Sequence, residues 1–214
     1  MTELDSPFRF PSIANIPEGE LVERLIGNPH WRGRILGLHG IPDGVAHRLM
    51  VPLIDFPKAL SGDIDILLVP PDRAELSIAI EVKRVKVAAT AFAGGRPNKL
   101  KEIAKAYQQA NRLAEAGFSQ VYCFLLVVVD SRSNNEGRFS YEGLTTSLKQ
   151  LIDTAISIEG LNDRVGLVHF EFVQPIDDEP LGSGTYGGDM KRLAIPVDQP
   201  EEVTAWIARL LGMS

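Results

Sequence analysis

Two short apolar segments each contain charged residues. These residues are of the types that bind a metal ion and support a metal-assisted reaction at a phosphate group. Asp65 lies in the first segment, and Glu81 and Lys83 lie in the second. Charged side chains among buried strands are destabilising unless they pair or bind a metal ion. Two carboxylates suit a hard cation that takes oxygen ligands, and a nearby ammonium suits a water molecule or a phosphate oxygen. These residue types therefore predict a site for Mg²⁺ or Mn²⁺.

Two strands must position these side chains. Residues 64–69 and 76–83 are rich in Ile, Leu and Val and have the length of core strands, and a double-proline turn separates them. Because side chains alternate across a strand, Glu81 and Lys83 share one face, and Asp65 lies on a single face of its own strand. We therefore expect Asp65 and the Glu81/Lys83 pair to meet at one sheet edge.

The same residues resemble the motif of the PD-(D/E)xK nuclease superfamily, which has the restriction-endonuclease-like fold. The resemblance rests on residues 62–68 (GDIDILL) and 80–83 (IEVK), with isoleucine where the literal motif has proline. It implies that Asp65 and Glu81 bind the metal, that the Val82 carbonyl assists, and that Lys83 acts on the attacking water. The implied activity is hydrolysis of phosphodiester bonds in nucleic acid, with DNA favoured.

A further acid, Glu18, falls on the apolar face of a helix predicted to begin at Pro17 and to end at Gly27. Residues 18–25 (EGELVERL) also resemble the first helix of archaeal Holliday-junction resolvases, in which an acid at this place reaches the metal site. The helix dipole explains a carboxylate at a helix start equally well. Both explanations of Glu18 stay open.

Positive charge is concentrated directly after the Glu-x-Lys triplet, although the whole chain has a net charge of −6. Residues 83–105 contain seven basic residues and one acid. A positive field beside a metal site suits a phosphate backbone, whereas a solvated helix face would have the same composition. The residues predicted to bind nucleic acid are Arg84, Lys86, Arg96, Lys101, Lys105 and Arg112.

A helix is predicted over residues 98–116, ended by a glycine. A polar stripe beside its apolar face consists of Lys101, Lys105, Gln108 and Arg112. In the resembled superfamily, a helix at this place contributes a polar residue near the active site. The resemblance gives that catalytic role to Gln108.

The order of the elements indicates a single α/β domain with a mixed central β-sheet flanked by helices. Residues 1–16 are predicted to form an N-terminal arm and 17–214 the domain, with its core in 17–175 and a C-terminal strand and helix in 190–212. Further predicted strands cover 47–55, 121–129, 165–173 and 192–197, a helix covers 141–158, and loops cover most of 29–60 and 182–188. The apolar stripe of the last helix, 200–211, either packs on the sheet, which is favoured, or contacts a second copy of the chain in a homodimer.

The cysteine content and the apolar runs of the sequence indicate the cellular compartment of the protein. The single cysteine, Cys123, cannot form a disulfide within the chain and suits a core position in a reducing compartment. The first residues do not have the pattern of a signal peptide, and the longest apolar run, 121–129, is too short to cross a bilayer. The expectation is a cytoplasmic protein that does not bind membranes.

Two rival interpretations use the same charged residues. A non-catalytic module that binds nucleic acid or protein would have the same fold without the chemistry. An unrelated α/β interaction protein would use Glu81 and Lys83 only as a salt bridge, worth about 0–1 kcal/mol at an exposed position. The presence of Asp65 together with Glu81 and Lys83 favours the metal-dependent nuclease.

Overall fold

The central element of the computed structural model is a six-stranded sheet in the order β1-β2-β3-β4-β5-β6. The structure describes residues 12–38, 41, 46–58, 60–92, 94, 97, 100–131, 144–157, 159–174 and 185–213. The strands are β1 (Ala46–Pro52), β2 (Asp63–Val69), β3 (Ile78–Val87), β4 (Gln120–Asp130), β5 (Gly166–Gln174) and β6 (Thr185–Arg192). Only the β3/β4 and β4/β5 pairs are parallel, so the predicted mixed sheet is confirmed.

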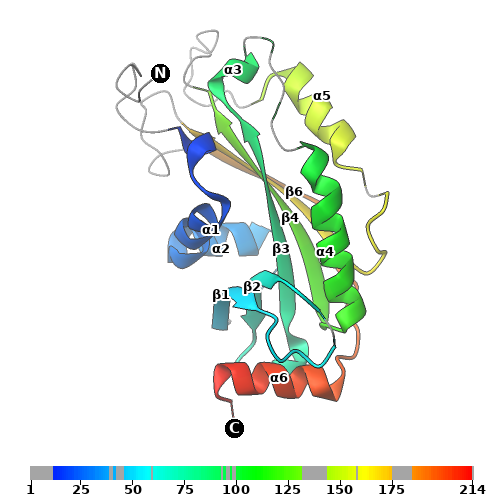
Figure 1. The fold of residues 1–214 in the computed structure, drawn as a ribbon. Helices are drawn as coiled ribbons and strands as arrows, with labels where there is room; N and C mark the ends of the chain where they lie inside the picture. Colours follow the sequence, from blue (N-terminus) through cyan, green and yellow to red (C-terminus); the bar gives the residue numbers. More distant parts are fainter. Residues whose placement is uncertain are drawn as a thin grey trace.

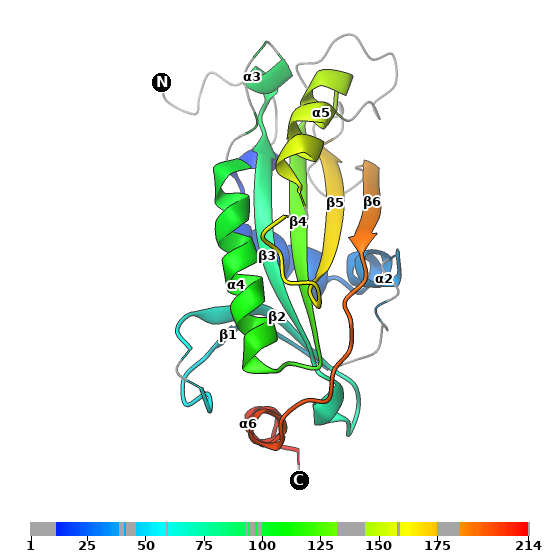
Figure 2. The same cartoon turned by 90° about the vertical axis from the view of Figure 1, so that its right-hand side faces the viewer.

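Helices cover both faces of this sheet. They are α1 (Glu18–Gly27), α2 (Pro29–Leu38), α3 (Ala89–Phe92), α4 (Ile103–Ala116), α5 (Thr146–Ala155) and α6 (Glu201–Leu211). Helices α1 and α2 lie on one side of β3 and β4, and α4 lies on the other (Figure 1). Helix α5 shares the α4 side, and α6 lies at the end of the molecule near the C-terminus (Figure 2). None of the described helices is long and apolar enough to cross a membrane.

Strand β4 is buried along nearly its whole length and separates two apolar clusters. Its alternating side chains pack toward α4 through Leu125 and Val127, and toward α1 and α2 through Phe124 and Leu126. A strand with parallel neighbours and helices on both faces requires such a continuous apolar run. Cys123 is fully buried in the first cluster, as predicted for a core residue.

The strongly periodic segments were predicted at nearly their observed places. Strands β2, β4 and β5 and helices α1, α4 and α6 match predicted elements within a few residues, and β1 is a shortened form of the strand predicted at 47–55. The helix predicted at 141–158 is α5, with bounds of Thr146–Ala155; residues 141–143 lie outside the described part of the chain.

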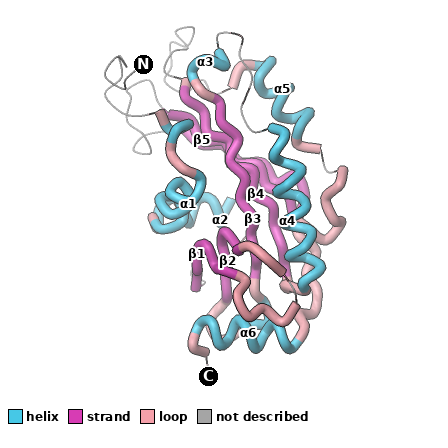
Figure 3. Tube along the Cα trace, viewed as in Figure 1, coloured by secondary structure: helices cyan, strands magenta, loops and turns pink. Residues whose placement is uncertain are grey.

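Two predictions about local structure were wrong, and the bounds of one strand were predicted incorrectly; Figure 3 shows the observed helices and strands. Residues 29–38 form α2 rather than a loop, because packing of Trp31, Ile35 and Leu36 on the sheet outweighs two helix glycines. Strand β3 begins at Ile78, two residues after the predicted start, and continues to Val87 beside β4. The edge strand β6 occupies 185–192 instead of 192–197, because pairing with β5 overrides the low strand propensity of its glycines.

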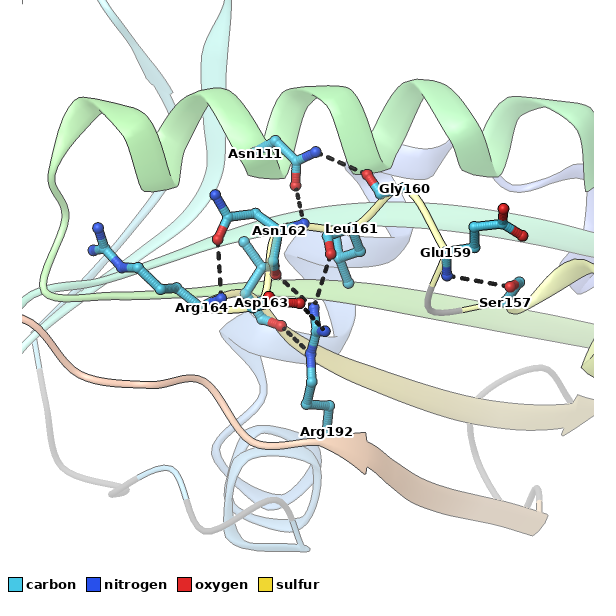
Figure 4. Close-up of polar contacts among 10 residues, drawn as sticks. Asn111, Ser157, Glu159, Gly160, Leu161, Asn162, Asp163, Arg164 and Arg192 are labelled. Carbon is cyan, nitrogen blue, oxygen red and sulfur yellow. Dashed lines mark hydrogen bonds and ion pairs between the residues drawn. The ribbon is translucent and has the colours of Figure 1, made fainter.

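A polar clamp fixes the connection between α5 and β5 (Figure 4). Asn111 of α4 donates to the Gly160 carbonyl at 2.9 Å and accepts from the Asn162 N–H at 2.8 Å. Arg192 of β6 donates to the carbonyls of Val165 at 2.9 Å and Asn162 at 2.6 Å. These bonds satisfy backbone groups of the connection and hold the edge strand in register with the rest of the sheet.

Candidate metal centre

Strands β2 and β3 pair over a short stretch and then separate, forming a fork. Their register joins Ile66 with Ile80 and Leu68 with Ile78. Beyond this point β2 stays with β1 as far as Asp63, while β3 continues beside β4. The N–H groups on the open side of β3 therefore lose a strand partner and need other acceptors.

Two carboxylates supply those acceptors. The Val82 N–H donates to Asp65 Oδ2 at 2.6 Å, and the Arg84 N–H donates to Glu18 Oε2 at 2.6 Å. Glu18 reaches the fork because it begins α1, whose apolar stripe packs against the sheet. A strand residue directs its N–H and C=O to the same edge, so the Val82 carbonyl also faces the fork.

The Lys83 ammonium is held at the same place by acids distant in sequence. Its Nζ donates to Glu18 Oε1 at 3.0 Å and lies 3.8 Å from Glu102 Oε2. Burial alone would lower the pKa of Lys83, but the hydrogen bond to Glu18 and the charges of Glu18, Glu102 and Glu81 outweigh it and raise this pKa. Lys83 is therefore protonated at neutral pH and acts as a hydrogen-bond donor.

Glu81 is the acid of the cluster whose carboxyl group lacks a hydrogen-bond or ion-pair partner among the described residues. It is 4% exposed and lines a cavity of about 20 Å³ together with Asp63, Gln109 and Arg112. Among the described residues, no hydrogen bond and no ion pair within 4.0 Å reaches its carboxylate, so the Glu81–Lys83 salt bridge of the rival interpretation is not formed. Burial, and then the charge of Asp65, raise the pKa of Glu81 to about 9.

Asp65 is affected by the same surroundings. Burial raises its pKa to about 6, although the Val82 N–H opposes the shift, and the charges of Asp63 and Glu18 add to it. The charge of Asp65 raises the pKa of Glu81, and two carboxylates in a buried fork attract a cation strongly when both are ionised. The geometry therefore brings Asp65, Glu81 and Lys83 together, with Glu18 among them.

The residues of the fork fit a hard divalent cation. Asp65, Glu81 and the Val82 carbonyl offer oxygen ligands only, which Mg²⁺ and Mn²⁺ prefer. Within the described ranges, no group of three His, Cys, Asp or Glu side chains could hold a metal ion. A site with two carboxylates does not require a third, because Mg²⁺ keeps several of its waters.

The polar residue from α4 differs from the predicted one. Gln108 is exposed and is not among the residues that line the cavity beside Glu81, whereas its neighbour Gln109 is. Two further acids near the site were not predicted from the sequence: Glu102, which approaches Lys83, and Asp63, which lines the cavity beside Glu81. Neighbouring residues of a helix point about 100° apart. Which of the two glutamines faces the fork therefore depends on how α4 packs on the sheet, which the sequence alone does not give.

The residues predicted to bind nucleic acid differ in how exposed their side chains are. Lys101, Lys105 and Arg112 are exposed along the α4 segment, and Lys86 is half-buried. Arg96 lies outside the described residues.

Arg84 is the exception, because it is only 4% exposed. Strand alternation directs its side chain to the face opposite Lys83, and its Nε and Nη1 have no hydrogen-bond partner among the described residues. The prediction that Arg84 contacts a nucleic-acid backbone is therefore corrected: in this structure its guanidinium is not accessible.

In comparisons with known proteins, no family model matches the chain and no curated protein sequence matches it.

Proposed function

We propose that the chain is a metal-dependent nuclease of the PD-(D/E)xK superfamily, with the restriction-endonuclease-like fold, that hydrolyses phosphodiester bonds, preferentially in DNA. One observation carries the proposal. Glu81 is a buried carboxylate that no hydrogen bond reaches within the described residues, and it lies in the same cluster as Asp65 and Lys83. Because its pKa is raised to about 9, Glu81 is protonated at neutral pH in the metal-free chain, and a buried carboxyl group without a hydrogen-bond partner does not stabilise the fold, so a purely structural role does not account for it.

Each residue of the fork has a distinct role in this proposal. Asp65, Glu81 and the Val82 carbonyl would hold Mg²⁺ or Mn²⁺, which when bound supplies Lewis-acid chemistry to the phosphate and to water. Lys83 donates a hydrogen bond to the attacking water or to a phosphate oxygen, where negative charge develops. Glu18 fixes the position of the Lys83 Nζ through its 3.0 Å hydrogen bond.

A second candidate function is a non-catalytic module on the same fold that binds nucleic acid or protein. The hydrogen bonds from Val82 and Arg84 favour it, because Asp65 and Glu18 satisfy backbone N–H groups whether or not a metal binds. This role explains two of the acids. It does not explain Glu81 or its raised pKa.

Cleavage assays with and without metal separate these functions. We expect the purified chain to cut supercoiled plasmid or short DNA duplexes in Mg²⁺ or Mn²⁺, and to lose this activity in EDTA, because the site needs the cation. Single-stranded DNA and RNA substrates in the same assay test the preference for DNA. Binding of duplex without cleavage in either metal would favour the non-catalytic module.

The exposed basic residues of the α4 segment should determine affinity rather than the chemical step. We expect the combined change of Lys101, Lys105 and Arg112 to Gln to weaken DNA binding and to reduce the slope of log K against log salt by up to about 2.7 for duplex DNA, because each phosphate contact contributes about 0.9. Fluorescence anisotropy at several salt concentrations measures this slope.

A matched triple variant removes the same charge elsewhere. Arg24, Arg73 and Arg209 are exposed and lie on α1, in the turn before β3 and on α6, and their change to Gln should leave the salt slope as in the wild type. Equal slopes for both triple variants would show that α4 is not a wall of the binding groove.

A further inference from the structure

A second polar cavity, of about 180 Å³, lies on the same face of the sheet as α4 and α5 but away from the fork. Helix α5 contributes Lys149 and Asp153 to its lining, β5 contributes His169 and Glu171, and β6 contributes further polar and glycine residues. None of these residues is used by the proposed metal centre.

The cavity is a separate compartment from the fork. Lys83, Leu125 and His169 are register partners across β3, β4 and β5. The Cα atoms of Lys83 and His169 are therefore about 10 Å apart, two strand spacings. Leu125 and Val127 of the intervening strand are fully buried, so a ligand of the cavity would not touch Lys83 through the sheet face.

Opposite charges are balanced in the cavity. Lys191 Nζ lies 2.5 Å from Asp189 Oδ2 and 3.9 Å from Asp153 Oδ1. Lys149 is exposed, and one oxygen of Glu171 accepts the Leu144 N–H at 3.3 Å. A bare phosphate would face three carboxylates, and a divalent cation would face two ammonium groups. The balance favours an uncharged ligand that has both donors and acceptors.

His169 has an unsatisfied polar atom beside this space. The side chain is 7% exposed, and its Nε2 has no hydrogen-bond partner among the described residues. Burial, and then the charge of Lys191, lower its pKa, so the ring is neutral and Nε2 can donate or accept according to the tautomer. Buried polar atoms are normally hydrogen-bonded, and this one has less than 1 Å² of accessible surface, so a ligand in the cavity reaches it once the imidazole ring turns toward the open space.

The floor of the cavity suits a flat molecule. Gly187 pairs with Glu171 across the strands, and a Cβ atom added to it would meet nothing within 4 Å. Glycine inside a strand often marks the close approach of a ligand to the backbone. The volume is close to that of a cavity of about 150 Å³ that binds benzene, so it fits a single six-membered ring.

We propose that this cavity binds a pyrimidine base, with cytosine favoured, whose amino group donates to Glu171 and whose ring acceptors face His169 and Lys149. Carboxylates accept from the cytosine amino group, which uracil does not have. The base can belong to a free nucleoside or to a strand. The inference depends on the cavity and not on the proposed nuclease activity.

Calorimetric titration with cytidine, uridine and ribose tests the proposal. Cytidine should bind about tenfold or more tightly than uridine, in line with the discrimination that one well-placed base contact gives. Ribose should not bind. Wild-type and Lys83→Met proteins should bind cytidine equally, so that failure of this proposal and failure of the nuclease proposal remain distinguishable.

Two variants keep the test falsifiable. Gly187→Val places a side chain in the open space and should abolish cytidine binding with an unchanged melting temperature, because a β-branched residue suits a strand. Glu171→Gln should remove most of the preference for cytidine over uridine. Wild-type affinity of Gly187→Val for cytidine would overturn the proposal.

A strand with one cytosine, compared with the same strand carrying an abasic site at that position, identifies the source of the base. Weaker binding of the abasic strand by the wild type, with no difference between the two strands in Gly187→Val, supports a base in a strand, and binding of cytidine alone supports a free nucleoside. Absence of both effects would overturn the proposal.

Discussion

Replacing Lys83 by Met should reduce cleavage by about 10²–10³-fold, the effect of removing one pre-positioned donor from a site of developing negative charge. Methionine keeps the apolar stem that packs in the strand, so the fold should be retained. Metal affinity should change little, because the oxygens of Asp65, Glu81 and Val82 are the proposed ligands. Single-turnover cleavage and Mg²⁺ calorimetry on the same preparation separate the two effects.

Two comparison variants sharpen this test. Lys105→Met removes a lysine from the exposed face of α4 and should weaken substrate binding without changing the single-turnover rate. Asp65→Asn should weaken metal binding and cleavage together, because it removes a charged ligand. Cleavage by Lys83→Met at the wild-type rate would refute the proposed role of Lys83.

The sequence was sufficient to predict the strands of the candidate site and its three central residues, because their signals are local. Apolar runs define β2 and β3, and strand alternation places Glu81 and Lys83 on one face. The separation of β2 from β3, which forms the fork, was not predicted. It depends on where β2 stops pairing with β3, and this is decided by long-range contacts rather than by residues within either strand.

The remaining partners of the site could not be found for the same reason. Glu18 meets Lys83 across 65 positions of sequence, and no local signal places the start of α1 beside β3. Gln109 and Gln108 differ only by the rotation of one helix residue. The cavity at His169 requires the pairing of β6, whose glycines give a strand signal too weak to recognise.

The free energy of unfolding of the metal-free chain should fall as the pH rises, which is unusual for a carboxylate. Glu81 titrates near 4.5 when unfolded and at about 9 when folded, so the folded state binds the proton more tightly. Below pH 4.5 Glu81 is protonated in both the folded and the unfolded state, so its contribution to the free energy of unfolding does not change with pH. Between the two values the folded state increasingly loses stability, and Asp65, with its pKa raised to about 6, adds a smaller effect of the same sign.

Glu81→Gln should remove most of this dependence, because the amide cannot ionise. At pH 8 the variant should be more stable than the wild type in EDTA by on the order of 5 kcal/mol, because the unfolded Glu81 has then been ionised over about 3.5 pH units while the folded one has not. Chemical denaturation between pH 5 and 9 measures this difference. Glu115→Gln, which changes an exposed carboxylate of α4, is the matched control and should follow the wild-type curve.

In Mg²⁺ the wild type should become more stable than Glu81→Gln, the reverse of the order in EDTA. The cation stabilises the folded wild type in proportion to its binding, and this stabilisation should grow with pH because the ligands must be deprotonated. Glu81→Gln has lost a charged ligand and should gain little from the cation at any pH. A wild-type protein whose stability rises between pH 6 and 9 in EDTA, or one that gains no stability from Mg²⁺ at pH 8, would contradict a metal centre built on Glu81.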